Sequence, residues 1–69
     1  MQIQENDNDY LNLELTIDRH GLSAVLDALA SICGAKADHL RANWQDAASA
    51  SVWDKDGRKI ASVAGKVQT

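Results

Sequence analysis

The chain contains no proline and no phenylalanine, and it has a single cysteine, Cys33. One cysteine excludes a disulfide within the chain, and an unpaired cysteine is typical of a reducing compartment. Cys33 and the two histidines, His20 and His39, do not have the spacing of zinc ligands. We therefore expect no bound metal and no cofactor.

Long hydrophobic runs are also absent. No segment approaches the roughly 18 consecutive apolar residues that a membrane-spanning helix needs. The opening residues, MQIQENDND, have neither the basic nor the apolar region of a signal peptide. We expect a cytoplasmic protein with no membrane partner.

Basic charge is missing from the first part of the chain. Residues 1–18 contain five acidic residues and no lysine or arginine, although the net charge of the whole chain is only −3. Four of the seven basic residues lie in the last fifteen: Lys55, Arg58, Lys59 and Lys66. Neither end forms the dense basic face of a nucleic-acid-binding module, so we expect no nucleic-acid partner. We expect residues 1–8 to be a disordered acidic tail and residues 9–69 to be one small domain.

The chain is too short to bury a large core. A domain of this length buries only about 60% of the surface that its unfolded chain exposes. Small domains without disulfides or metals commonly rely on a partner chain. We therefore expect a homodimer.

The segment 10–17, within YLNLELTID, is compatible with two structures. Its apolar residues Leu11, Leu13, Leu15 and Ile17 alternate with polar ones, which is typical of a half-buried strand. Leucine and glutamate are also good helix formers, so a helix stays open here.

Residues 19–41 are predicted to form a helix, with Asp18 as its N-cap. Apolar residues recur at spacings of three and four, which is the period of a helix with one buried face. They are Leu22, Val25, Leu26, Leu29, Ile32, Cys33, Ala37 and Leu40. Because Cys33 lies in this stripe, we expect a buried structural cysteine and not a reactive thiol.

Residues 44–66 are predicted to form a second helix. Asn43 is expected to cap it, and Asp46 favours its positive end. The alternative for 48–64 is a β-hairpin around Asp56-Gly57, a strong two-residue turn. The abundance of alanine favours the helix. The predicted fold class is all-α: a helical hairpin that pairs with a second copy to form a dimeric four-helix bundle.

The block LSAVLDALASICGAKADHLRANWQDAASASVW, residues 22–53, resembles a group of short bacterial proteins that have no assigned activity. Their shared pattern has the form ICxxKAxHLRxNWQD, with a further tryptophan after it. The resemblance implies helical structure after the motif. Asp56-Gly57 departs from the expected helix-forming residues, so the resemblance implies a kink or break there.

Candidate binding residues lie where the two predicted helices meet. Lys36, His39 and Asn43 are three, four and seven residues apart, which places them on one ridge of a helix. Asp46 is expected near the end of that ridge, and Trp44 beside it. This ridge is either a binding site or a solvated helix end. Trp53 is expected in the core, whereas Trp44 points away from it and is expected at the turn or against another chain.

Catalytic motifs are missing: there is no P-loop, no G-x-S-x-G and no paired-carboxylate arrangement. We therefore do not expect an enzyme. The predicted function is a protein-interaction or regulatory module that acts as a small homo-oligomer. The alternative is a small-ligand-binding protein that uses Lys36, His39 and Asn43 at a cleft between subunits.

Overall fold

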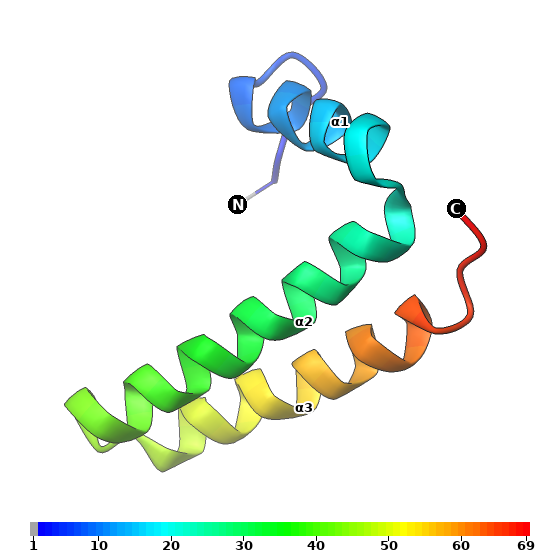
Figure 1. The fold of residues 1–69 in the computed structure, drawn as a ribbon. Helices are drawn as coiled ribbons and strands as arrows, with labels where there is room; N and C mark the ends of the chain where they lie inside the picture. Colours follow the sequence, from blue (N-terminus) through cyan, green and yellow to red (C-terminus); the bar gives the residue numbers. More distant parts are fainter. Residues whose placement is uncertain (1) are drawn as a thin grey trace.

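A computed structural model describes residues 2–69, and they form three α-helices and one turn of π-helix. The helices are α1 (Asn8–His20), α2 (Leu22–His39) and α3 (Ala47–Ala64), and the π-helical turn η1 (Leu40–Trp44) joins α2 to α3. The prediction of an all-α fold is confirmed, because no strand occurs among these residues. In Figure 1, α2 and α3 run antiparallel side by side, and α1 crosses the first part of α2 on the side away from α3.

The ambiguous segment 10–17 is helical and lies inside α1. In a helix its alternating apolar residues fall on two different sides, with Leu11 and Leu15 on one and Leu13 and Ile17 on another. No residue of α1 is buried. The alternation therefore reflects a helix that is apolar on two sides, and not a half-buried strand.

The expected disordered tail includes residue 1, which lies outside the described residues. Within residues 2–7, the Gln4 backbone N–H donates to the Asp7 carboxylate at 3.0 Å. The Asp7 N–H donates back to the Gln4 carbonyl at 3.0 Å. The chain makes this turn immediately before α1 begins at Asn8.

Gly21 separates α1 from α2, so the predicted single start at Arg19 and the predicted cap at Asp18 are wrong. Gly21 has φ 87° and ψ 156°, a conformation that is essentially restricted to glycine. A Cβ at this position would lie 2.7 Å from the Thr69 carbonyl oxygen. That oxygen accepts a hydrogen bond from the Ser23 N–H at 3.2 Å, which satisfies one of the unpaired donors at the start of α2.

The α2–α3 interface is built from small residues. Cys33 and Ala37 of α2 are buried, as are three residues of α3 at intervals of seven: Ala50, Gly57 and Ala64. A Cβ added at Gly57 would lie 2.9 Å from Cys33 Cβ and 3.3 Å from the Ala30 carbonyl oxygen. The two helices therefore approach so closely that Gly57 has to be a glycine. The prediction that Cys33 is buried is confirmed.

Gly57 lies in the interior of α3, so the alternative hairpin around Asp56-Gly57 is wrong. The expected break at this dipeptide is also wrong, since α3 is one helix from Ala47 to Ala64. Packing against α2 explains why a helix-weakening residue is held in helical conformation here. The start predicted at residue 44 is wrong by three residues, because η1 ends at Trp44 and α3 begins only at Ala47.

The chain is extended for its length. Its radius of gyration is 13.7 Å, and its principal extents are 37 × 28 × 16 Å. A compact domain of 69 residues would have a radius of gyration of about 11 Å. The difference follows from the architecture, in which a two-helix layer carries a third helix across one end (Figure 1).

We expect alanine substitutions at two glycines to change stability in opposite directions. Gly34→Ala should stabilise the fold by about 0.5–1 kcal/mol, the usual gain of alanine over glycine inside a helix, because nothing lies within 4 Å of the added Cβ. Gly57→Ala gains the same propensity but forces α2 and α3 apart. Overpacking of this kind costs about 1–3 kcal/mol, so a net loss is expected.

Urea unfolding of both variants at one fixed protein concentration measures the two free energies. Equal stabilisation by the two substitutions would contradict a close approach of the helices at Gly57.

Candidate functional site

The structure brings His39 and Asn43 together at the end of α2. The Asn43 amide donates to His39 Nδ1 at 2.9 Å and to the His39 carbonyl oxygen at 3.2 Å. This arrangement fits the neutral imidazole with its proton on Nε2. Asn43 was predicted to cap the second helix. That prediction is wrong, because Asn43 lies inside η1 and bonds backwards to α2.

Lys36 lies one turn before His39 on the same exposed side of α2. Together with Ile32 and Ala35 these two residues line a shallow depression of about 330 Å³. Its floor is apolar and its edge carries one ammonium and one imidazole group. Three of the predicted residues therefore do share a ridge, but Asn43 uses its amide group within the turn.

Asp46 belongs to the start of α3 and not to the ridge of Lys36 and His39. Its carboxylate Oδ1 accepts a hydrogen bond from the Ser49 N–H at 3.0 Å, so Asp46 is the N-cap of α3. This backbone hydrogen bond, with a contribution from the Ser49 side chain, lowers the pKa of Asp46. Among the described residues no hydrogen bond joins Asp46 to Lys36, His39 or Asn43. Asp46 is thus a capping residue that precedes a helix, and the sequence signal for it was an aspartate directly before the alanine-rich segment that begins at Ala47.

Gln45 makes the sharp change of direction between the helices. It has φ 52°, the left-handed conformation that is uncommon for residues other than glycine. The N–H groups of Gln45 and Asp46 both point to the Leu40 carbonyl oxygen, with the Asp46 bond at 3.1 Å. Left-handed residues with bonds of this kind commonly end helices, so a helix-ending role accounts for the conformation of Gln45.

The two tryptophans are both accessible to solvent. Trp44 at the end of η1 is 70% exposed, as expected for a residue that points away from the core. Trp53 was expected in the core, and this is wrong because it is 38% exposed on α3. The small-residue interface leaves no space for an indole between α2 and α3.

Arg41 fastens the turn to α3, which the sequence analysis missed. Its guanidinium forms a hydrogen-bonded ion pair with Asp54 and lies 3.6 Å from the Asp38 carboxylate. The hydrogen bond to Asp54 raises the pKa of Arg41. The partners are thirteen residues apart, so only the hairpin geometry brings them together.

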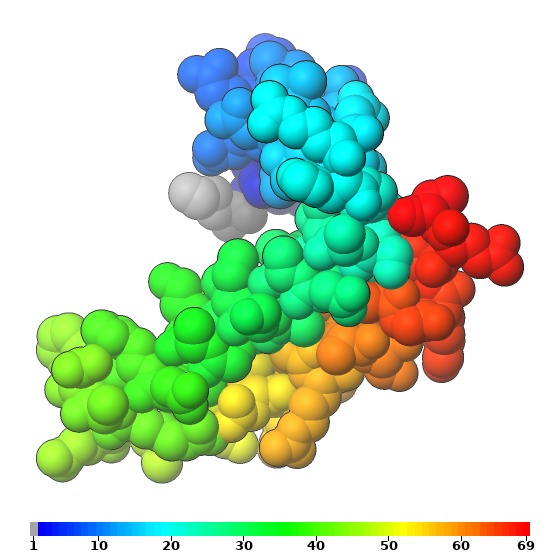
Figure 2. Space-filling view, in the orientation of Figure 1, coloured from blue at the N-terminus to red at the C-terminus, as the bar shows by residue number. Residues whose placement is uncertain are grey.

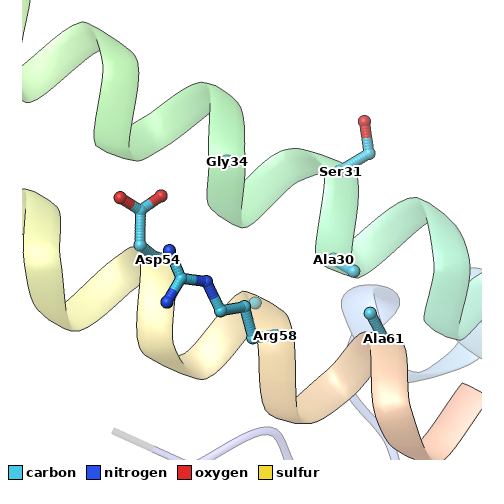
Figure 3. Close-up of a pocket in the computed structure, with 7 residues that line it drawn as sticks. Ala30, Ser31, Gly34, Asp54, Arg58 and Ala61 are labelled. Carbon is cyan, nitrogen blue, oxygen red and sulfur yellow. The ribbon is translucent and has the colours of Figure 1, made fainter.

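Two further depressions lie outside the predicted site. One, of about 340 Å³, lies between α2 and α3 beside Gly57. Figure 3 shows Asp54 and Arg58 in the space between these helices and the Ser31 hydroxyl pointing away from it. The other, of about 300 Å³, lies along α1 and is lined by Tyr10, Leu13, Glu14 and Ile17.

Many large apolar side chains are exposed at the surface. Eleven large apolar residues are exposed in the part of the chain that the structure describes, and they occur on every helix. Figure 2 shows that α1 stands over one end of α2 and leaves the other end uncovered. The apolar residues in question are Ile3, Tyr10, Leu11, Leu13, Leu15, Leu29, Ile32, Trp44, Val52, Trp53 and Val63.

Residues 2–69 contain neither a metal site nor a membrane-spanning helix. No group of three or more His, Cys, Asp or Glu side chains is placed to hold a metal ion. No described helix combines the length and the hydropathy needed to cross a membrane. Comparisons with protein-family models, with curated proteins and with solved structures found no match to this chain.

The Asp46 cap should make part of the stability depend on pH. Because folding lowers its pKa, the ionised cap stabilises the fold above the ordinary aspartate pKa of about 3.9. This contribution is lost as the pH falls through the lower folded-state value. Asp46→Asn keeps a capping oxygen that does not titrate.

The free energy of unfolding of the wild type minus that of Asp46→Asn should therefore fall between neutral pH and about pH 2–3. Asp46→Ala, which removes the cap, should be less stable than Asp46→Asn by an amount that does not vary with pH. Urea titrations at several pH values measure both differences. If the difference in free energy of unfolding between the wild type and Asp46→Asn does not change with pH, an ionised cap is ruled out.

Proposed function

We propose that this protein is a non-enzymatic protein-interaction or regulatory module that acts as a small homo-oligomer. The proposal places the working surface on the exposed apolar faces of the helices, and not in a cavity. The three depressions are shallow, and Asp54, which lines the one beside Gly57, is already paired with Arg41. No predicted site residue is held in a buried polar environment.

The observation that carries the proposal is the surface area. The chain exposes 5494 Å², whereas a folded monomer of 7.5 kDa is expected to expose about 4,200 Å². The excess of about 1,300 Å² is larger than the roughly 800 Å² that each partner contributes to a stable interface of standard size. A second copy of the chain would remove this excess.

The composition of the core supports the same conclusion. The buried apolar residues are Val25, Cys33, Ala37, Ala50 and Ala64, and none of them has a large side chain. Burial of one leucine-sized side chain contributes about 1.5–3 kcal/mol, and such burial is missing here. For the pairing itself we propose the four-helix bundle, with Leu29 of α2 and Trp53 of α3 packed between the hairpins.

We expect the protein in solution to have twice the 7.5 kDa mass of one chain. Leu29→Ser should weaken the dimer by at least about tenfold, since two leucines are lost from one interface. Ala28→Ser changes an exposed residue of the same helix and should leave the dissociation constant unchanged. Light scattering coupled to size exclusion, over a range of concentrations, measures these masses. A wild-type monomer throughout that range would contradict the proposed function.

A small-ligand site at the end of α2 is the second proposal. The observation that favours it is the depression bounded by Ile32, Lys36 and His39. An ammonium and an imidazole beside an apolar floor would suit a small amphipathic anion. This proposal has less support than the first, because the depression is shallow and Asn43 bonds to His39 and not outwards.

A thermal-shift screen against small carboxylates tests this second site. A true ligand should raise the melting temperature of the wild type but not that of His39→Ala. A shift that survives this substitution, or no shift with any compound, would eliminate the ridge as a binding site.

A further inference from the structure

The acidic helix α1 and the basic part of α3 lie apart within one chain. In Figure 1, α2 separates them, and among residues 2–69 no contact joins α1 to α3. Residues 2–18 contain five acidic residues and no basic one, whereas residues 57–66 contain three basic residues and no acidic one. The opposite charges therefore do not meet inside the molecule.

The α1 outer face combines apolar and acidic side chains. It consists of four residues at helical spacings of three, four and seven: Leu11, Glu14, Leu15 and Asp18. All four are exposed, and Leu15 is 54% exposed. An isolated helix shorter than about 12–15 residues is marginal in water. Because α1 has 13 residues and buries none of them, it needs a further surface to pack on.

The α3 outer face has the complementary character. It consists of Val52, Lys55, Lys59 and Val63, which share one side of the helix away from Gly57. All four are exposed, and Val52 is 58% exposed. Each face is bordered by one residue of the other sign, Arg19 beside the α1 outer face and Asp56 beside the α3 outer face. These two exceptions also have opposite charges.

We propose that in the homodimer the α1 outer face of each chain packs on the α3 outer face of the other chain. Each α1 stays in contact with its own α2, and we call this reciprocal contact the helix exchange. This inference rests on the proposed function, because it adds a second contact between the two copies to the one proposed at Leu29 and Trp53. Apolar contacts between these leucines and valines would add to the affinity, while the flanking charges would select the orientation. The excess surface of the monomer supplies the area that such a contact requires.

Reversal of charge on either face should dissociate the dimer. Glu14→Lys/Asp18→Lys makes both outer faces of a chain basic, and Lys55→Glu/Lys59→Glu makes both acidic. Each variant alone should dimerise at least about tenfold more weakly than the wild type, because the pairs between residues 14 and 18 of one chain and residues 55 and 59 of the other become repulsive. Asp9→Lys and Arg58→Glu change the same charges on other sides of α1 and α3, and they should leave the dimer intact.

Mixing the two double variants is the decisive experiment. A basic α1 then meets an acidic α3, and in the reciprocal contact an acidic α1 meets a basic α3. An equimolar mixture should therefore form a heterodimer of near wild-type affinity, measured by light scattering and by native mass spectrometry, which separates the unequal masses. Circular dichroism of each variant reports whether its helices are kept, and rescue on mixing excludes unfolding as the cause of dissociation.

Two results would overturn the proposal, and they differ in what they imply for the function. If both double variants remain dimers as tight as the wild type, the helix exchange is wrong while the homo-oligomer stands. The exchange is also wrong if the variants dissociate but do not associate on mixing. If the wild type itself is a monomer at every concentration, the proposed function fails together with the exchange.

Discussion

The close approach of α2 and α3 at Gly57 is the constraint on which the rest of the molecule depends. A carbon atom in place of the Gly57 hydrogen would meet Cys33 Cβ at 2.9 Å, so this interface excludes large side chains. Alanines at intervals of seven continue the same contact along α3. The buried residues of the two helices are consequently small, with Val25 the largest of them, while both tryptophans, Leu29, Val52 and Val63 are exposed. The thin core between α2 and α3 follows from this one close approach.

The turn η1 shows how polar groups hold such a thin structure in register. Asp46 caps α3, Asn43 bonds back to His39, and Arg41 reaches across to Asp54. An exposed ion pair such as Arg41–Asp54 contributes little stability by itself. These three interactions do fix where α2 ends and how α3 returns. The residues that suggested a binding ridge are thus to a large extent the residues that shape the joint between the helices.

Local features of the fold could be predicted from the sequence, whereas those that depend on distant contacts could not. The helix over Leu22–His39 and the burial of Cys33 were predictable from helical spacing, although Leu29 and Ile32 of the same apolar stripe are exposed. The grouping of Lys36 with His39 followed for the same reason. A Cβ at Gly21 would lie 2.7 Å from the Thr69 oxygen, and a Cβ at Gly57 would lie 2.9 Å from Cys33 Cβ. Neither of these distant contacts can be read from the sequence. Residues 10–17 could not be assigned from the sequence, because leucines at alternate positions suit both a half-buried strand and a helix with two apolar sides.

The two ends of the α2–α3 hairpin differ in the length of chain that their contacts close, and α1 is attached through Gly21 at the end with the longer loop. Contacts near η1 join residues thirteen apart, as in Arg41–Asp54, while the Ser23 hydroxyl bonds to the Ala64 carbonyl across forty-one residues. Closing a longer loop costs more chain entropy. We therefore expect contacts between α2 and α3 to form first near η1 and last near Ser23, and to open in the reverse order. The end that frays first carries α1. Helix α1, which has more exposed large apolar residues than α2 or α3, is therefore attached at the end of the hairpin that opens first.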